Sequence, residues 1–463
     1  MRYISTRGQA PVLGFSDVTL AGLATDGGLY VPESWPQVTA ALQQEWRSLS
    51  YSELATRLML PFLGGEIPED SFRAMVHDAY ATFRHPAVTP LVQLDSNLWL
   101  QELFHGPTLA FKDVALQLLG RLFDHILAER GERITIVGAT SGDTGSAAIE
   151  ACRDREAIDI FILFPKGRVS PVQQRQMTTV QSTNVHCIAV DGSFDDCQDL
   201  VKALFADTAF REEVNLSAVN SINWARVMAQ TAYYAFAALQ LGAPERSIDV
   251  AVPTGNFGNI FAAYSAKLMG FPIERLIVGS NKNDILTRFF RDDDMSLKGV
   301  EPSLSPSMDI QFSSNAERLL FDLFDRNGMA TAEAMQQLRS ECRMNLGDNR
   351  HAAAKAMFSA ASFDDQATLA CIADWHTRSG YTLDPHTAVG VLAAEACAPV
   401  RDRPLVVGAT AHPAKFPDAV EQATGLRPPL PAVLADLFER EERLTGLPND
   451  IRELQSLVHE RRC

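Results

Sequence analysis

Cysteine is scarce in this sequence: seven occur among 463 residues, and no two of them form a C-x-x-C pair. The sequence is therefore not that of a small disulfide-stapled domain, and an odd set of unpatterned thiols is typical of a reduced, intracellular protein. The first ten residues, MRYISTRGQA, lack the apolar core of a signal peptide, and no apolar run reaches the roughly 18 residues that cross a bilayer. We expect a cytoplasmic protein that does not enter a membrane.

Positive charge is also in short supply. Lys and Arg number 41 against 57 Asp and Glu, which gives a formal net charge of −16. This balance excludes nucleic acid and anionic membrane surfaces as partners. A pocket for a small anion is still compatible with it, but the positive groups of such a pocket must be gathered locally. No His, Cys and Asp residues have the spacing of metal ligands, so no metal is predicted.

The rest of the composition is ordinary for a globular protein, at 46% hydrophobic and 21% charged, and we find no internal repeat. From residue 89 onward, short apolar runs alternate with amphipathic segments, which predicts a doubly wound α/β fold with mostly parallel strands buried on both faces. The expected strands are 134–139, 161–165, 186–190, 247–253, 275–280 and 404–409. The expected helices between them are 172–181, 194–208, 224–241 and 259–269.

Two further regions differ from this alternation. Residues 1–88 contain turn-rich pieces and two helix-like stretches, 51–63 and 71–83, and predict a small leading domain. Residues 312–397 are mainly helical in pattern, with Ala-rich stretches near 333–342 and 352–361.

The first candidate functional segment is ITIVGATSGDTGSAAIEAC, residues 134–152, in which a strand, a loop over 140–145 and a helix follow one another. Its Thr, Ser and Gly residues present hydroxyl and N–H groups at a helix start, where a carboxylate or phosphate is favoured. An ordinary turn, with Asp143 or Thr144 capping the helix, is the alternative.

The second segment, VAVPTGNFGNIFAAY, again joins a strand to a helix through a glycine-flanked turn. Successive N–H groups there can cradle a phosphate. The segment is neither a Walker A loop nor a G-x-G-x-x-G dinucleotide motif. By itself it is equally compatible with a structural turn.

The third segment, ELFHGPTLAFKDVALQLLGRLF, places Lys112 at the start of a helix, where the positive end of the helix dipole disfavours it. A lysine held there and partly desolvated loses its proton more readily, as an amine must to form a Schiff base. The alternative is a solvated surface lysine paired with Asp113. A phosphate cradle, a carboxylate cradle and an activated lysine are together the parts of a pyridoxal-phosphate (PLP) enzyme.

The sequence resembles the threonine synthases of the long bacterial and fungal type, within the tryptophan-synthase-β-like, fold type II group of PLP enzymes. The segments YISTRG, DGGLYVP, HGPTLAFKD, GATSGDTGSAA, NSINWAR, PTGNFGN, SPSMDI and TAHPAKF carry the resemblance in the same order over nearly the whole chain. Two places depart from it: residues 288–300 lack an expected Thr-Gly pair, and Ala316 stands where the family commonly has Phe.

The resemblance implies a role for each matching residue. Lys112 would be the catalytic, Schiff-base lysine, and Thr410 would face the pyridine nitrogen. The cofactor phosphate would be bound by the loop Gly255, Asn256, Phe257, Gly258 and Asn259. The substrate would be bound through its carboxylate, or the cofactor through its phenolic oxygen, by Thr140, Ser141, Asp143 and Thr144. The substrate phosphate would be bound by Asn220, Ser221, Asn223 and Arg226, with His412 and Lys415 as less certain neighbours.

The resemblance also implies the fold and the domains. We expect two doubly wound α/β lobes of mostly parallel sheets flanked by helices, plus a small N-terminal domain. The N-terminal domain would be 1–88 and the PLP-dependent catalytic region 89–463. Within that region the smaller lobe would be 129–235, the larger lobe 89–128 and 236–430, and a C-terminal helical extension 431–463.

The implied activity is that of a lyase that eliminates phosphate from O-phospho-L-homoserine and adds water, giving L-threonine and phosphate. A phospholyase or dehydratase of the same fold that releases 2-oxobutyrate is the alternative. An inactive regulatory module is disfavoured because Lys112 and the loops are intact, and a nicotinamide dehydrogenase because the dinucleotide motif is missing. The relatives suggest a monomer or a weak homodimer.

Overall fold

The computed structural model describes residues 1–462, and these form two compact units. The first unit comprises residues 1–106 and 221–428, and the second comprises residues 107–220 and 429–462. The sequence predicted lobe boundaries at 128/129 and 235/236 instead. In the structure the helix 112–130 packs on the helix 143–152, and the helix 224–240 packs on the helices 51–63 and 258–268. The predicted division into an N-terminal domain and two lobes remains a prediction.

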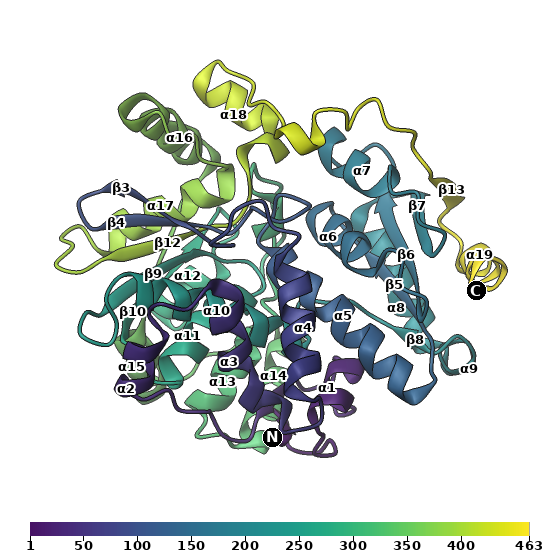
Figure 1. Ribbon diagram of the computed structural model, residues 1–463, viewed down its shortest axis with the longest axis horizontal. Coiled ribbons are helices and arrows are strands. Elements are labelled where there is room, and N and C mark those ends of the chain that lie inside the picture. The colour runs from purple at the N-terminus through teal and green to yellow at the C-terminus, as the bar shows by residue number, and fades with distance from the viewer. Residues whose placement is uncertain (463) are drawn as a thin grey trace. The chain divides into compact units, whose positions relative to one another are not determined.

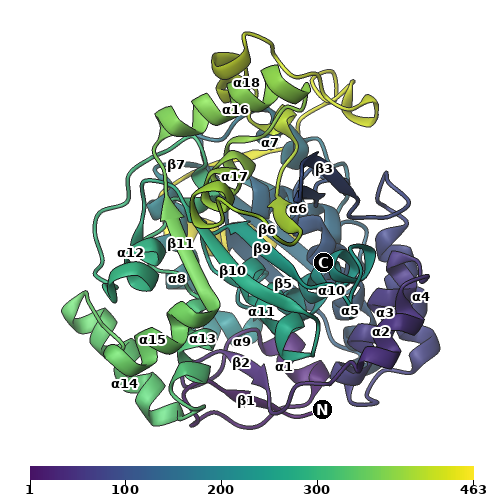
Figure 2. The same cartoon turned by 90° about the vertical axis from the view of Figure 1, so that its left-hand side faces the viewer.

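The first unit is built on a six-stranded sheet whose strands lie in the order β11-β10-β9-β12-β4-β3. All neighbours are parallel except the edge strand β3, which pairs antiparallel with β4. The bounds are β3 (Leu91–Asp95), β4 (Leu98–Glu102), β9 (Ile248–Pro253), β10 (Ile273–Ser280), β11 (Phe358–Ser362) and β12 (Leu405–Ala409). Figure 2 shows β9, β10 and β11 side by side.

Helices cover both faces of this sheet, and its inner strands β9 and β12 are accordingly buried along their whole length. Helix α17 (Pro385–Cys397) packs across β9, β10, β11 and β12 and joins α16 (Asp365–Ser379) in one core cluster with Ala251, Ile277 and Val407. Helix α11 (Gly258–Leu268) packs on β9 and β10 and on the helix α10 (Trp224–Gln240), which is labelled beside it in Figure 1.

The remaining elements of the first unit surround this core. They are β1 (Tyr3–Ser5), α1 (Phe15–Ala21), β2 (Tyr30–Pro32), α2 (Ala40–Trp46), α3 (Tyr51–Leu63), α4 (Glu69–Tyr80), α12 (Ile285–Asp292), η1 (Pro306–Met308), α13 (Ala316–Leu323), α14 (Gly328–Glu341), α15 (Asp348–Met357), η2 (Pro413–Lys415) and α18 (Pro417–Thr424).

The second unit is built on a five-stranded, wholly parallel sheet in the order β13-β7-β6-β5-β8. Its strands are β5 (Ile134–Ala139), β6 (Ile158–Pro165), β7 (Val185–Asp191), β8 (Leu216–Ser217) and β13 (Thr445–Pro448). Its helices are α5 (Lys112–Arg130), α6 (Asp143–Cys152), α7 (Pro171–Thr178), α8 (Phe194–Ala206), α9 (Thr208–Glu213), η3 (Ala432–Leu434) and α19 (Ile451–Arg461). α6 packs on β6 and on α5 and α7, while α8 packs on β5 and β6 and contacts α19.

The expected α/β fold, with mostly parallel sheets flanked by helices, is confirmed, and all six expected strands are present. Two local expectations were wrong. Residues 358–361 continue an Ala-rich helical pattern in the sequence but form β11, and the C-terminal extension is not only helical, because β13 pairs with β7.

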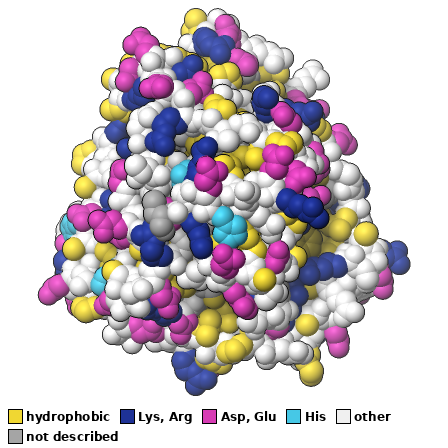
Figure 3. Space-filling model, turned by 90° about the vertical axis from the view of Figure 1, so that its right-hand side faces the viewer, with side chains coloured by type: hydrophobic (Ala, Val, Ile, Leu, Met, Phe, Trp, Pro, Cys, Tyr) yellow, Lys and Arg dark blue, Asp and Glu magenta, His cyan; other side chains and the backbone are white. Residues whose placement is uncertain are grey.

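Charges of both signs are interspersed on the face drawn in Figure 3. No described helix combines the length and the apolar character that a membrane crossing requires. Within residues 1–462, no group of three or more His, Cys, Asp and Glu side chains is arranged to hold a metal ion.

Candidate active site

Lys112 begins α5, as the sequence predicts, but it is not the solvated surface lysine of the alternative reading. Its side chain is buried, and its Nζ lies 3.1 Å from Oδ2 of Asp143, which is equally buried. Asp113, the partner expected in that alternative, instead accepts hydrogen bonds from N and Oγ1 of Thr108, at 2.8 and 2.7 Å. The structure therefore places the amine against a buried carboxylate that is distant from it in the sequence.

The loop after β5 is shorter than predicted because α6 already begins at Asp143, with Gly142 at the N-cap. Oγ1 of Thr140 accepts from N of Gly142 and N of Gly145, at 3.0 and 2.8 Å, and so holds the turn together. Gly142 has φ +135°, and a Cβ there would lie 2.5 Å from the side chain of Gln173. That glutamine donates from Nε2 to Oδ1 of Asp143 at 2.8 Å, so the second carboxylate oxygen is also held in place.

The predicted phosphate loop joins β9 to α11 in the first unit. Phe257 caps the helix in the left-handed region, with φ 64°, and its side chain is buried. A Cβ on Gly255 would lie 2.6 Å from the carbonyl oxygen of Ser307. Glycine is therefore required here because another segment of the chain lies against the loop, which sequence reasoning did not foresee.

That segment, residues 305–315, donates hydrogen bonds to the backbone of the loop. Ser313 donates from Oγ to the carbonyl oxygen of Gly255 at 2.7 Å. Asn315 donates from Nδ2 to the carbonyl oxygens of Asn256 and Ser221, at 2.9 and 3.1 Å. The residues that directly follow the SPSMDI motif thus support the loop, and Asn315 links the loop to the segment that was predicted to bind the substrate phosphate.

Arg226 lies in the first turn of α10 and is almost completely buried, at 3% exposure. Its Nε and Nη1 atoms are buried and have no hydrogen-bond partner among residues 1–462. Burial lowers the pKa of this guanidinium well below its usual range, to about 10. A buried cation with unused donors is costly unless an anion completes it, so this arrangement favours an anion site.

The neighbouring residues of the NSINWAR segment differ in whether their side chains are free to bind a ligand. Asn223 is the N-cap of α10: its Oδ1 accepts from N of Ala225 at 2.9 Å and its Nδ2 donates to the carbonyl oxygen of Thr19 at 2.8 Å. Both ends of that side chain are therefore in use. Oδ1 of Asn220, by contrast, is buried and has no partner within the described part of the chain.

Thr410 follows β12 directly and is 5% exposed. Its N donates to Oγ1 of Thr387 at 3.2 Å, while its own hydroxyl makes no hydrogen bond within residues 1–462. Lys415, in η2, is fully buried. His412 accepts from N of Ala414 through Nδ1 at 3.1 Å.

The His412 ring is held in its neutral form. Burial, and then electrostatic interaction with Arg84 and His105, lower its pKa from 6.5 to about 4. Glu102 and Asp384 oppose that shift only in part. His412 is therefore an acceptor and not a cation at neutral pH.

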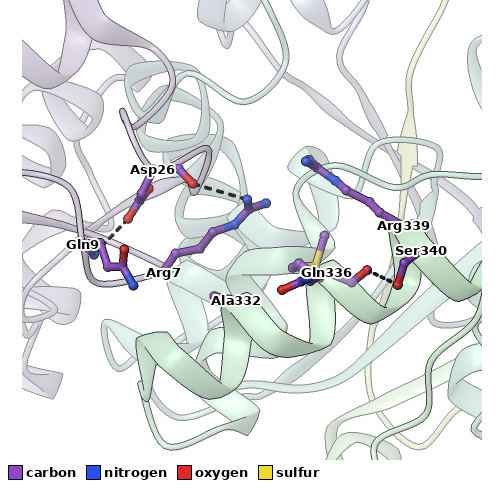
Figure 4. Close-up of a pocket in the computed structure, with 8 residues that line it drawn as sticks. Arg7, Gln9, Asp26, Ala332, Gln336, Arg339 and Ser340 are labelled. Carbon is purple, nitrogen blue, oxygen red and sulfur yellow. Dashed lines mark hydrogen bonds between the residues drawn. The ribbon is translucent and has the colours of Figure 1, made fainter.

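A separate pocket of about 440 Å³ lies in the first unit, lined by Arg7, Gln9, Asp26, Ala332, Met335, Gln336, Arg339 and Ser340 (Figure 4). Arg7 is already paired with both oxygens of Glu317, at 3.0 and 2.9 Å. Asp26 accepts from Oγ of Ser5 and from N of Gln9, Ala10 and Gly28, which together outweigh burial and lower its pKa. Because these two charged groups serve the local structure, the pocket is not the candidate active site.

The buried lysine at a helix start and the loop between β9 and α11 are features of a PLP enzyme, and the family models agree. Residues 82–362 match the model described as pyridoxal-phosphate dependent enzyme. Residues 2–80 match threonine synthase N terminus, and residues 387–458 match threonine synthase, C-terminal. The chain is therefore a PLP-dependent enzyme of fold type II.

Individual relatives narrow the class to one family. The threonine synthase of Pseudomonas aeruginosa is 57% identical over 99% of this chain and 98% of that protein. The crystal structure of PLP-bound threonine synthase from Brucella melitensis has a TM-score of 0.98 and 55% identity, covering 100% of this chain and 99% of that one. The yeast threonine synthase structure has a TM-score of 0.94 and 39% identity, covering 99% and 98%. The chain belongs to the threonine synthase family.

Proposed function

We propose that this enzyme converts O-phospho-L-homoserine and water into L-threonine and inorganic phosphate, acting as a carbon–oxygen lyase on a phosphate ester. The observation that carries the proposal is Arg226. It is a buried guanidinium with two unpartnered nitrogens, in a chain of net charge −16, and an anionic substrate group would complete it. A planar guanidinium can bind a phosphate through two donors at once. The family membership supports the same substrate.

The residues present fit PLP. When bound, the cofactor withdraws electron density from the α-carbon of the substrate and so permits loss of the α-proton. Lys112 would hold it through a Schiff base, and the amine would then serve as the base for proton transfers once the substrate amine has displaced it. Asp143, 3.1 Å away, would orient the amine.

The other cofactor contacts would come from two further segments. The N–H groups of Gly255, Asn256, Phe257, Gly258 and Asn259 would bind the cofactor phosphate at the start of α11. The Thr410 hydroxyl, which has no partner in the described chain, would meet the pyridine nitrogen as a neutral group. Such a partner does not require a protonated ring.

The substrate would be bound by two segments. Thr140, Ser141, Asp143 and Thr144 would act at the start of α6 through N–H and hydroxyl groups, because the Asp143 carboxylate itself repels a substrate carboxylate. Asn220, Ser221 and Arg226 would bind the substrate phosphate. Asn223 would support them as the helix cap, since its side chain is fully engaged.

Three broader predictions belong with this proposal. We propose a monomer or a weak homodimer, as the family resemblance implies. We propose a cytoplasmic location, which the six described cysteines support because they are all free thiols. The domain division 1–88 and 89–463 likewise stays our proposal, and the family model for residues 2–80 supports its first boundary.

A phospholyase that stops at 2-oxobutyrate would use the same phosphate site, so the products decide between the two activities. The human relative is named threonine synthase-like 2 and is 38% identical over 96% of this chain.

The first test is phosphate release from O-phospho-L-homoserine by the PLP-loaded enzyme. We expect release by the wild type, none with Lys112→Ala, and a large rise in KM with Arg226→Gln. Release that persists in Lys112→Ala would refute the role of the lysine. Absence of release by the wild type would refute the substrate assignment.

A further inference from the structure

One buried carboxylate in the first unit, that of Asp384, accepts four hydrogen bonds. It is the N-cap of α17, in the sequence Asp-Pro-His-Thr, and is 1% exposed. Oδ1 accepts from N and from Nδ1 of His386, each at 2.9 Å. Oδ2 accepts from N of Thr387 at 3.3 Å and from its hydroxyl in a short contact. A helix cap needs only the two N–H groups, so the two side-chain contacts call for another explanation.

The contact between Asp384 and the Thr387 hydroxyl continues to Thr410. Because the Thr387 hydroxyl donates its single hydrogen to Asp384, its oxygen is left as an acceptor. N of Thr410 donates to that oxygen at 3.2 Å. Thr387 and Thr410 are 1% and 5% exposed, so water does not substitute for this contact. The carboxylate thus fixes the position of the Thr410 backbone through one intermediate.

The contact between Asp384 and the His386 ring continues to Ser307. N of Ser307 donates to Nε2 of His386 at 3.2 Å. Nε2 must therefore be an acceptor, and the ring proton lies on Nδ1, facing Asp384. The His386 ring is 3% exposed and packs against the ring of Phe416, with centroids 4.8 Å apart. The ring thus has one tautomer and one orientation.

One chain of hydrogen bonds ends at Thr410, which we assign to the cofactor, and the other ends at Ser307, which lies against the proposed phosphate loop. Thr410 is the proposed partner of the pyridine nitrogen. The carbonyl oxygen of Ser307 is the group that Gly255 must accommodate, because a Cβ on Gly255 would lie 2.6 Å from it. Two backbone segments far apart in the sequence, one for the ring and one for the phosphate loop, are therefore tied to a single carboxylate.

We propose that Asp384 is a positioning residue that sets the ring partner Thr410 and the phosphate loop at Gly255 relative to each other, through Thr387 and His386. Asp384 acts through these residues and does not itself touch the cofactor. The inference rests on the proposed roles of Thr410 and of the 255–259 loop.

The direction of each hydrogen bond predicts how the network responds when Asp384 is replaced by asparagine. All four groups facing Asp384 are donors, and a carboxylate accepts only. In Asp384→Asn the side chain has nearly the same shape, but its NH₂ must face either the Thr387 hydroxyl or the His386 ring. Facing the ring, the NH₂ forces the ring proton onto Nε2 and leaves N of Ser307 without an acceptor; facing Thr387, it removes the acceptor that N and the hydroxyl of Thr387 share. A helix cap by itself would not show this cost, because asparagine caps helices as well as aspartate.

The test is reconstitution of the full-length apoenzyme with PLP, with three readouts: the dissociation constant of PLP, the visible absorption maximum of the bound cofactor, and the thermal midpoint of the apoenzyme. Thr387→Val removes the acceptor of Thr410 at constant shape, and Thr387→Ser restores it. We expect Thr387→Val to raise the dissociation constant about tenfold and to shift the absorption maximum. Thr387→Ser should retain wild-type values, and Asp384→Asn should be at least as impaired as Thr387→Val.

Two reference variants separate this inference from the site assignment beneath it. If Thr410→Val and Gly255→Ala bind PLP as the wild type does, the proposed cofactor site is wrong. If those two bind PLP weakly while Thr387→Val and Asp384→Asn bind it normally, the positioning role is overturned. It is also overturned if the latter two only lower the apoenzyme midpoint and leave the affinity and the absorption maximum unchanged.

Discussion

Nζ of Lys112 and Oδ2 of Asp143 lie 3.1 Å apart, and both side chains are nearly removed from solvent. Breaking such a buried pair from one side is destabilising because the remaining charge loses its partner. We expect Asp143→Asn to lower the free energy of unfolding of the apoenzyme by about 3 kcal/mol. In the PLP-loaded enzyme the loss should be smaller, since the Lys112 amine is then bonded to the cofactor.

The measurement for Asp143→Asn is urea unfolding with and without PLP. Asp113→Asn is the matched control, because Asp113 is a neighbouring buried carboxylate bonded to Thr108. Its cost should be the same in both forms. An equal cost of Asp143→Asn in the two forms would show that the carboxylate does not serve the amine.

We expect the Arg226 side chain to lower the stability of the folded protein while being required for activity. Its guanidinium is buried with two unpartnered nitrogens, so Arg226→Met should leave the free energy of unfolding unchanged or raise it by about 1–3 kcal/mol. The same substitution should abolish activity. Thermal unfolding of the PLP-loaded enzyme with added inorganic phosphate provides the check: phosphate should raise the midpoint of the wild type and not that of the variant. A clear loss of stability in Arg226→Met without phosphate would contradict this view.

His412 predicts a loss of stability in mild acid. Its pKa in the folded protein is about 4 instead of 6.5, so between these values the unfolded chain binds a proton that the folded protein does not. The associated stability is complete above pH 6.5 and is lost as the pH falls toward 4. In His412→Asn, which can still accept from N of Ala414, this part of the pH dependence should disappear, an effect on the order of 2–3 kcal/mol. Free energies of unfolding for both proteins across this range test it, and parallel curves would argue against it.

Gly255 should tolerate no side chain. A Cβ there would lie 2.6 Å from a backbone oxygen, whereas one on Gly258 would lie 3.2 Å from Nδ2 of Asn315, which would have to shift by only a few tenths of an ångström. We therefore expect Gly255→Ala to weaken PLP binding at least tenfold and Gly258→Ala to weaken it much less. Comparable PLP affinities in the two variants would show that contact with Ser307 does not limit the loop.

The sequence predicted the central strands well because they are buried on both faces. Strands β5, β6, β7, β9, β10 and β12 are continuous apolar runs, and each was located within three residues at either end. The missed strands lie at or next to the sheet edges. β13 contains Gly446 and Pro448, and β11 reads Phe-Ser-Ala-Ala-Ser after an Ala-rich helix, so neither has the apolar run that identifies a buried strand.

In the candidate site, too, residues with a local signal could be predicted from the sequence, and contacts between distant residues could not. Lys112 was found because its place at a helix start conflicts with the helix dipole, which is a local signal. Its partner Asp143 is 31 residues away and could not be paired with it without the fold. The Asp-Pro-His-Thr segment does carry a local signal, an aspartate cap followed by proline, but that predicts only a helix start. The hydrogen bonds from that cap to Thr410 and Ser307 depend on the tertiary structure.

The most direct test of the central claim is the ratio of products formed from O-phospho-L-homoserine by the PLP-loaded enzyme. Phosphate, L-threonine and 2-oxobutyrate are quantified in the same reaction, with Lys112→Ala as the blank. We predict one threonine for each phosphate released. Phosphate accompanied by 2-oxobutyrate in place of threonine would contradict the assignment and identify a phospholyase.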